Sequence, residues 1–323
     1  MLLIFYTQPA TLKITKLKQI AKNILSIAIP ITISSVILNV NKLIDMTMIL
    51  SRLFAIGYTQ EQANAVYGAY STMAVSIFNL PATFVSAIAV PLVPALTYEI
   101  ENRNHEKIGS VISSAYKLCA LIAFPAGLGI SIFSKPILSL LFSSQANDIE
   151  YTAPLLSLLG ISVFLSSMIT VTNAVLQSYK QVKKPIISMA IGTALKLLLS
   201  YVLIGIPSVN VYGAPISTFF STLIIVAFNL FFIARNSPKT DKLYNVFAKP
   251  FIAALISITA GVALFICLAH FTDSRIIILP TIAAVMLIYL FAIMKIKAIN
   301  ENEITMLPKG EKLINILKKL HFI

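Results

Sequence analysis

The run Tyr67–Leu96, YGAYSTMAVSIFNLPATFVSAIAVPLVPAL, decides the fold class because it contains no Asp, Glu, Lys or Arg. A helix needs about 20 apolar residues to cross the hydrocarbon core of a bilayer, so this run is long enough to span one. The whole chain of 323 residues is 58% hydrophobic and 11% charged, whereas soluble domains are about 25% charged. The sequence therefore predicts an integral membrane protein and excludes a soluble globular domain.

Similar runs recur along the chain. We number the eight predicted transmembrane helices in chain order: Ile24–Leu50, Tyr67–Leu96, Val111–Phe133, Ala153–Leu176, Pro185–Ile206, Val211–Ile233, Phe247–Ala269 and Ile276–Met294. The runs are long and do not alternate between polar and apolar residues, which favours helices over the strands of a membrane barrel. The predicted fold class is all-α integral membrane, with about eight transmembrane helices.

The distribution of Lys and Arg predicts the orientation, because loops on the cytoplasmic side are enriched in both. With the N-terminus in the cytoplasm, cytoplasmic segments hold 19 of the 25 Lys and Arg residues and the outer loops hold three. We therefore predict a multi-pass protein of the cytoplasmic membrane with both termini in the cytoplasm. This topology accounts for most of the net charge of +13, so nucleic-acid binding need not be invoked.

Polar residues recur at helical spacing in four of the first six helices, and each set falls on one face. These stripes are Ser34, Asn41, Asp45 and Arg52; Thr72, Ser76, Asn79, Thr83 and Ser86; Ser162, Ser166, Thr170, Asn173 and Gln177; and Ser188, Gly192, Lys196 and Ser200. The seventh and eighth helices have no such stripe. We predict a six-helix bundle with a polar interior and two peripheral apolar helices. The alternative for any single Ser or Thr is an ordinary helix–helix contact.

This division gives four predicted segments. Residues 1–22 form a basic cytoplasmic lead-in, of which Met1–Tyr6 is a candidate stub of a preceding helix. Residues 23–235 form the six-helix transporter lobe, and residues 236–298 hold the two additional transmembrane helices. Residues 299–323 form an amphipathic tail with Lys312, Lys318 and Lys319 on its polar side, which is typical of a helix lying on the cytoplasmic interface.

Charges inside the predicted helices are the strongest functional signal, because each costs at least about 2.5 kcal/mol on insertion scales. Lys42, Lys117 and Lys196 lie within helices with Asp45 as the one acid, and Arg52 lies near the outer end. A cationic cavity of this kind suits an anionic substrate such as a pyrophosphate head group. Each residue has an alternative: Lys42 or Lys196 neutralises Asp45, Lys117 snorkels to the interface, and Arg52 is an interfacial anchor.

No catalytic constellation is visible in the sequence. His105, His270 and His321 stand at helix ends or in loops without a partner at useful spacing, and Cys119 and Cys267 both lie in apolar runs. We therefore predict that the protein is not an enzyme, and we assign it no metal and no cofactor.

Several segments together resemble a known family. They are ILSIAIPITISSVILNVNKLIDMTMILSRLFAIGYTQEQANAVYGAYS in and after the first helix, FNLPATFVSAIAVPLVPALTYE in the second, VLQSYKQVKKPI after the fourth, and IPSVNVYGAPIST between the fifth and sixth. This pattern resembles the polysaccharide exporters of the multidrug/oligosaccharidyl-lipid/polysaccharide superfamily. Within it, the stage V sporulation protein B branch, which includes lipid II flippase-like proteins, is the most similar. The resemblance runs from about residue 18 to residue 294.

The family fold has two six-helix lobes followed by two extra helices. The resemblance implies that this chain corresponds to the second lobe and the two extra helices. Either the chain is a fragment or one half of a split reading frame, or it works beside a first lobe that is encoded separately or supplied by a second copy. Asp45 and Arg52 match polar and charged positions of the family's seventh helix, and Asn79 and Pro81 match its bent eighth. Lys42 and Lys196 enter the predicted substrate site from the charge argument, with Ser34, Asn41, Lys117 and Asn173 as candidate cavity-lining residues.

The resemblance also implies a function. We expect part of a flippase that moves a polyprenyl-pyrophosphate-linked saccharide or peptidoglycan precursor by alternating access, with membrane lipids and this lipid-linked anionic substrate as its partners. Three alternatives stay open: an ion-coupled exporter of small molecules, a non-transporting membrane partner of cell-envelope synthesis, and an inactive remnant.

Overall fold

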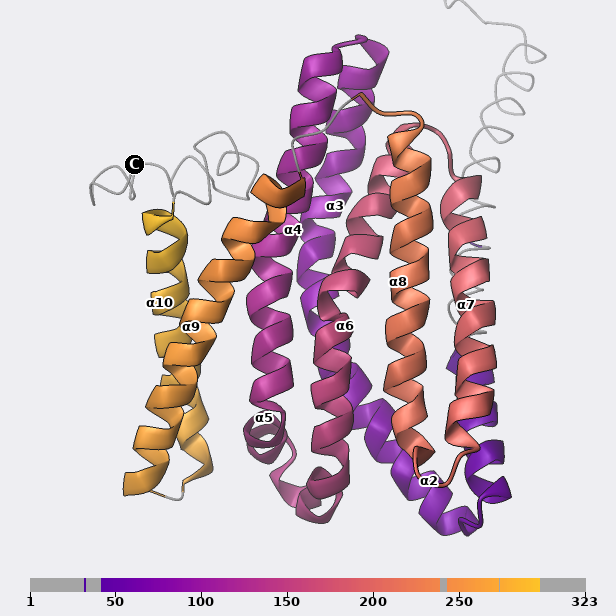
Figure 1. Cartoon of the computed structure of the whole chain (residues 1–323), viewed down its shortest axis with the longest axis vertical. Coiled ribbons are helices and arrows are strands. Elements are labelled where there is room, and N and C mark those ends of the chain that lie inside the picture. The colour runs from indigo at the N-terminus through magenta and orange to yellow at the C-terminus, as the bar shows by residue number, and fades with distance from the viewer. Residues whose placement is uncertain (1–31, 33–41, 239–242, 273, 297–323) are drawn as a thin grey trace, which may run out of the picture. The chain divides into compact units, whose positions relative to one another are not determined.

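The computed structural model describes residues 32, 42–238, 243–272 and 274–296 (Figure 1). It divides into two compact units, Met1–Asp45 and Met46–Ile323. In the first unit residues 42–45 are helical, and in the second unit residues 46–55 are helical. The predicted lead-in, the amphipathic tail, Ser34 and Asn41 lie outside the described residues.

All the regular structure in the described part of the chain is helical, which confirms the all-α prediction. The elements of the second unit are α2 (Gln60–Ala69), η1 (Tyr70–Ala74), α3 (Val75–Glu101), α4 (His105–Ile132), α5 (Ser134–Leu141), η2 (Ser143–Gln145), α6 (Ala146–Ser178), α7 (Lys183–Ile204), η3 (Asn210–Tyr212), α8 (Gly213–Ala234), α9 (Leu243–Phe271), η4 (Arg275–Ile277) and α10 (Ile278–Lys295).

Seven helical runs in the described residues are long and apolar enough to cross a membrane. They coincide with the second to eighth predicted helices, and most of the first falls outside the described residues. The protein is therefore a multi-pass membrane protein. The prediction missed α5, and α6 begins at Ala146, seven positions before the expected Ala153.

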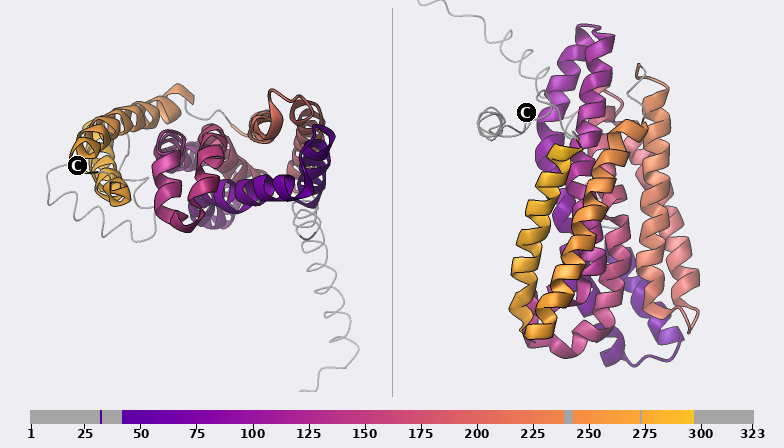
Figure 2. Two further views of the ribbon diagram at one scale, coloured as in Figure 1. Left: turned by 90° about the horizontal axis from the view of Figure 1, so that it is seen from below. Right: turned by 60° about the vertical axis from the view of Figure 1, so that its left-hand side comes forward.

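The helices pack in a definite order. α6 lies at the centre of the bundle, against α3, α4 and α8. α7 packs along α8 and barely touches α6, while α9 packs on α4 and pairs with α10 (Figures 1 and 2). The α9–α10 hairpin and the α7–α8 hairpin therefore lie at opposite edges of the bundle. The predicted boundaries at residues 235 and 298 stay predictions.

Small residues set the closest helix contact, between α4 and α6. A Cβ added to Gly160 would lie 2.7 Å from the backbone nitrogen of Ser131 and 2.9 Å from the carbonyl oxygen of Gly127. Beside these glycines the Ser131 hydroxyl donates to the carbonyl of Ser157 at 2.9 Å, and the Ser157 hydroxyl donates back to the carbonyl of Ser131 at 2.7 Å. Close approach and reciprocal hydrogen bonds are how helices associate in lipid, where burial of apolar surface provides no driving force between them.

The run from α2 into α3 changes direction along its length (Figure 1). It contains the π turn η1 and, further on, the buried Pro81 inside α3. A π turn and an internal proline are both ordinary causes of a kink, because each interrupts the regular hydrogen-bond ladder. The bending role predicted for Pro81 stays a prediction, since the two causes lie close together.

Candidate functional site

The polar stripe of α3 lies on an open face of the second unit. Thr72 of η1 and Ser76, Asn79 and Thr83 of α3 are exposed, and Ser86 is half-buried. The hydroxyls of Thr72, Thr83 and Ser86 donate to carbonyls of their own helical run. Their oxygen lone pairs stay available, and the exposed amide of Asn79 makes no side-chain hydrogen bond within the described residues. The stripe can therefore accept and donate hydrogen bonds to a ligand.

The stripe leads into a groove of about 430 Å³ between α3 and α6, which we call the α3–α6 groove. Its walls are Ser86, Ala89, Val90 and Val93 of α3 and Thr170, Asn173, Ala174 and Gln177 of α6. Beyond Val93, the hydroxyl of Ser178 donates to the Val93 carbonyl at 3.3 Å and the hydroxyl of Thr97 donates to the Ser178 carbonyl at 3.4 Å. These bonds hold α3 and α6 together next to the groove.

The buried amide of Asn229 on α8 holds one of the side chains that line the groove. Asn229 is fully buried, and its Nδ2 donates to Asn173 Oδ1 at 2.8 Å and to Thr172 Oγ1 at 3.0 Å. Asn173 Nδ2 in turn lies 3.9 Å from the sulfur of Met189 on α7. These contacts fix which end of the Asn173 amide faces α8, so the side chain is pre-organised in the groove wall.

The groove is uncharged, because none of its eight lining residues is Asp, Glu, Lys, Arg or His, and four of the eight carry a hydroxyl or an amide. Hydroxyls and amides of this kind match sugar hydroxyls and peptide or acetamido groups, which also donate and accept hydrogen bonds. A pyrophosphate would instead need cations.

The predicted cations lie elsewhere. Lys42 is exposed and Asp45 is half-buried in the first unit, while Lys117 of α4 and Lys196 of α7 are half-buried in the second. None of them lines the α3–α6 groove. Of the predicted site residues within the described part, the structure brings only Asn173 into the groove wall, and Asn79 lies on the polar stripe that leads to it.

Arg52 packs against α7. Its guanidinium carbon lies 4.2 Å from the ring centre of Tyr201 on α7, and a Cβ on Gly205 would collide with the guanidinium. Its Nε is buried without a hydrogen-bond partner in the described residues. Close by in the chain, Tyr58 accepts a hydrogen bond from the amide of Asn210. Arg52 is thus a partly buried cation that packs on an aromatic ring of α7, with its Nε shielded from solvent.

The stripe predicted on the fifth helix proves to be largely a packing seam. Ser188, Gly192 and Ser200 of α7 are buried. The Ser200 and Ser217 hydroxyls share a 2.6 Å hydrogen bond, and the Ser221 hydroxyl donates to the Gly192 carbonyl at 2.8 Å. These contacts close α7 onto α8, which is the alternative reading of Ser at helical spacing.

Sequence reasoning missed Asn229. A signal for it exists, since Asn229 is the one amide residue in the apolar run Val211–Ile233, and a buried amide in a membrane helix needs a partner on another helix. No group of three or more potential metal ligands occurs among the described residues.

The fold is similar to that of two solved membrane transporters. It aligns with an outward-facing multidrug resistance MATE family transporter of the MOP superfamily at a TM-score of 0.52 and 18% identity, over 88% of this chain and 67% of that one. A MOP superfamily transporter from Pyrococcus furiosus aligns at a TM-score of 0.53 and 16% identity, over 91% and 66%. At these identities the likeness shows the fold alone.

Sequence comparison then gives the family. Residues 2–296 match the model of the lipid II flippase MurJ family, so the chain belongs to this family, as the resemblance predicted. It is 25% identical to the uncharacterized membrane protein YabM of Bacillus subtilis, over 94% of this chain and 56% of the relative. It is 21% identical to stage V sporulation protein B of Bacillus subtilis, over 92% and 56%. The chain spans about half the length of these relatives.

Proposed function

We propose that this chain forms part of a flippase that moves a polyprenyl-pyrophosphate-linked saccharide or peptidoglycan precursor across the cytoplasmic membrane by alternating access. Membership of the lipid II flippase family supports the class of substrate. A relative of the chain in Bacillus subtilis is itself named lipid II flippase MurJ, at 24% identity over 51% of this chain.

The observation that carries the proposal is the exposed polar face of α3. A row of hydroxyls and an amide on the outside of a membrane helix is costly against lipid, because lipid offers these groups no hydrogen bonds. This face is therefore best accounted for by a water-filled path or a facing protein surface. The α3–α6 groove extends it, which gives a saccharide a continuous series of hydrogen-bonding groups.

The proposed roles of the residues follow their chemistry. The α3–α6 groove binds the sugar or peptide head group, with Asn173, Gln177 and Ser86 as hydrogen-bonding partners. The cations Arg52 and Lys196 bind the pyrophosphate. Lys42 lies in the first unit, and its role as a ligand stays a prediction. Both termini lie in the cytoplasm, and the protein performs transport without a chemical reaction on the substrate.

The proposal also includes a second six-helix lobe. The matched relatives are about twice as long as this chain, so we propose that a further six-helix lobe faces α3 and completes the cleft. This lobe is a part of the same longer polypeptide, a separately encoded protein or a second copy of this chain, and cross-linking from Asn79→Cys distinguishes the last two by the mass of the product.

The test measures binding of a fluorescent polyprenyl-pyrophosphate saccharide to the full chain in lipid nanodiscs. We expect the double variant Asn173→Leu/Gln177→Leu to bind at least about tenfold more weakly, which corresponds to about 1.4 kcal/mol. Leu keeps the approximate volume and removes the hydrogen-bonding groups. Ser257→Ala is the matched control, because Ser257 is buried in α9 and bonds to its own helix. Equal binding by the double variant and the control would refute the groove assignment. No binding by the unmodified chain when it is combined with the lobe that faces α3 would refute the proposed substrate.

A further inference from the structure

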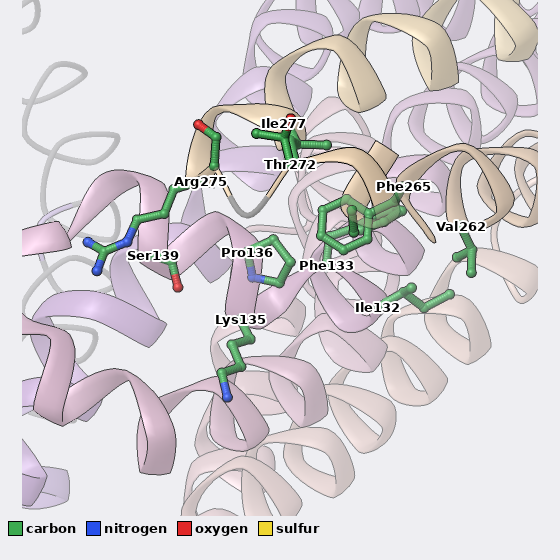
Figure 3. Close-up of a pocket in the computed structure, with 12 residues that line it drawn as sticks. Ile132, Phe133, Lys135, Pro136, Ser139, Val262, Phe265, Thr272, Arg275 and Ile277 are labelled. Atoms are coloured by element: carbon green, nitrogen blue, oxygen red, sulfur yellow. The ribbon is translucent and has the colours of Figure 1, made fainter. Parts of the chain in front are cut away.

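A second pocket lies apart from the α3–α6 groove, between the end of α4, the short helix α5, and α9 with η4 (Figure 3). Its volume is about 510 Å³, which is within the usual range of small-molecule sites, about 300–1,000 Å³. We call it the α5–α9 pocket. It shares no lining residue with the α3–α6 groove, so substrate binding there does not account for it. Its lining residues are Ile132, Phe133, Lys135, Pro136, Ser139, Val262, Phe265, Ala269, Thr272, Ser274, Arg275 and Ile277.

The interior of the pocket is apolar. The rings of Phe133 and Phe265 meet edge to face with their centres 5.8 Å apart, and Ile132 and Val262 flank them. Figure 3 shows these groups at the centre of the view. Apolar cavities exclude water unless polar partners are present. An alkyl chain is therefore the occupant that this surface favours.

Two cations stand at its edge. Lys135 begins the first turn of α5 and Arg275 begins η4. In Figure 3 the charged ends of both side chains point away from the two phenylalanine rings. None of the twelve lining residues is acidic. The lining residues thus place two cations at the edge of an apolar interior.

Neither cation is held by a strong internal partner. Lys135 pairs with Glu150 at 3.1 Å, but the two side chains are 60% and 80% exposed. An exposed ion pair contributes about 0–1 kcal/mol and exchanges readily with another anion. Arg275 is exposed and makes no ion pair with the described residues. Both cations can therefore accept an external anion.

Lys135 and Arg275 lie at the depth in the membrane where lipid head groups are found. Ile132 is the last residue of one membrane-spanning run, and Arg275 is the first residue of another. The two cations thus lie where the hydrocarbon core ends, and lipid phosphates lie in the interfacial layer just outside that core. In the predicted topology both cations lie on the outer side of the membrane, so the head group belongs to a lipid of the outer leaflet.

We infer that the α5–α9 pocket binds one glycerophospholipid with an anionic head group. The phosphate lies against Arg275 and Lys135, and an acyl chain lies against Phe133 and Phe265. The bound lipid bridges α5 of the bundle and the α9–α10 hairpin. This inference does not depend on the proposed transport function, because the pocket and the groove are separate.

The test uses the full chain in nanodiscs that contain equal amounts of phosphatidylglycerol, which is anionic, and phosphatidylcholine, which has no net charge. After extraction in mild detergent, native mass spectrometry measures the lipids that stay bound. We expect the unmodified chain to retain phosphatidylglycerol preferentially. Lys135→Gln/Arg275→Gln lowers this preference about tenfold, equivalent to about 1.4 kcal/mol. The control Lys183→Gln, which removes an exposed cation at the start of α7, keeps it.

A second variant tests the apolar part without changing the charge. Ala269→Trp adds a large side chain at an exposed position on the pocket wall, and we expect it to lower retention of phosphatidylglycerol while the melting temperature stays unchanged. Equal retention of both lipids by the unmodified chain would overturn the inference. So would an equal loss in Lys183→Gln, or displacement of the bound lipid by a polyprenyl phosphate, which would assign the pocket to the transport substrate.

Discussion

The polar face of α3 and the α9–α10 hairpin are both on the outside of the second unit, yet their surfaces differ in kind. α3 presents Ser76, Asn79 and Thr83, whereas the hairpin presents large apolar side chains such as Ile266, Met286 and Leu287. Exposure is therefore not equivalent to contact with lipid. A surface that faces lipid can be apolar all round, while a surface with hydrogen-bonding groups needs water or protein beside it. Cysteine labelling tests this difference directly, and two sets of substitutions compare the packing of the bundle with that of the hairpin.

The largest effect is expected from cysteine labelling in a Cys267→Ser background. Asn79→Cys on α3 should react with a membrane-impermeant maleimide, and Leu287→Cys on α10 should not, because a thiol in lipid meets no dissolved reagent and barely ionises. Native Cys119 is fully buried and gives the background. A lipid-soluble maleimide should label Leu287→Cys, which controls for folding. If Asn79→Cys and Leu287→Cys behaved alike with the impermeant reagent, the contrast between the two surfaces would be lost.

The next largest effect is a loss of stability, which we expect from Gly→Ala substitutions at two different helix contacts. Gly160→Ala places a methyl group against the backbone of Ser131 and Gly127, so we expect a loss of about 1–3 kcal/mol through overpacking. Gly261→Ala in α9 would place its Cβ in collision with a methyl group of Val285 and 3.6 Å from Phe133, so it meets side-chain atoms of α10 and Phe133 and no backbone atom. We expect a smaller loss there.

Gly68→Ala is the control for this series, because nothing lies within 4 Å of the added Cβ. Thermal unfolding in detergent, followed by a thiol-reactive dye that reports exposure of Cys119, ranks the three variants. A larger loss for Gly261→Ala than for Gly160→Ala would show that the hairpin, rather than the α4–α6 contact, is the tightly packed region.

The smallest effect on stability is expected from removing the reciprocal hydrogen bonds between α4 and α6. Side-chain hydrogen bonds in membrane proteins contribute about 0.6 kcal/mol on average, so Ser131→Ala/Ser157→Ala should cost about 1 kcal/mol. Thr259→Ala in α9 is the counterpart, because this exposed hydroxyl bonds only to carbonyls of its own helix. We expect no measurable change for it in the same unfolding assay. Equal losses at both places would contradict a bundle held together by polar contacts.

Much of the fold could be predicted from sequence because a membrane span is a local property. A helix must satisfy its own backbone in lipid, so apolar length alone located α3, α4 and α6 to α10. The short helix α5 has no such length, and Ser134–Leu141 is too brief to show a periodicity that stands out. The early start of α6 was hidden because Asp148 and Glu150 made its first turns look like a loop.

The candidate site was predicted less well because a stripe shows which residues share a face but not what that face meets. The stripe of α6 contains Asn173, which lines the groove, and its role in lining a transport cavity stays a prediction. The same spacing on α7 placed Ser188 and Ser200 in a packing seam. Partners that are distant in the chain carry no local signal at all, as in the contact of Arg52 with Tyr201. The roles of Lys42, Asp45, Arg52, Asn79 and Lys196 as substrate ligands stay predictions.

The contacts of α8 determine how a movement of α7 would reach the α3–α6 groove. It packs against both α6 and α7, whereas α7 barely touches α6. A rotation of α7 would therefore be transmitted to α8 through Ser217 and Ser221, and α8 carries Asn229, which holds Asn173. Chains of packed side chains and hydrogen bonds are able to carry such coupling between two places in a protein. A displacement that begins at the edge of the bundle would thus reach the groove as a reorientation of one amide side chain.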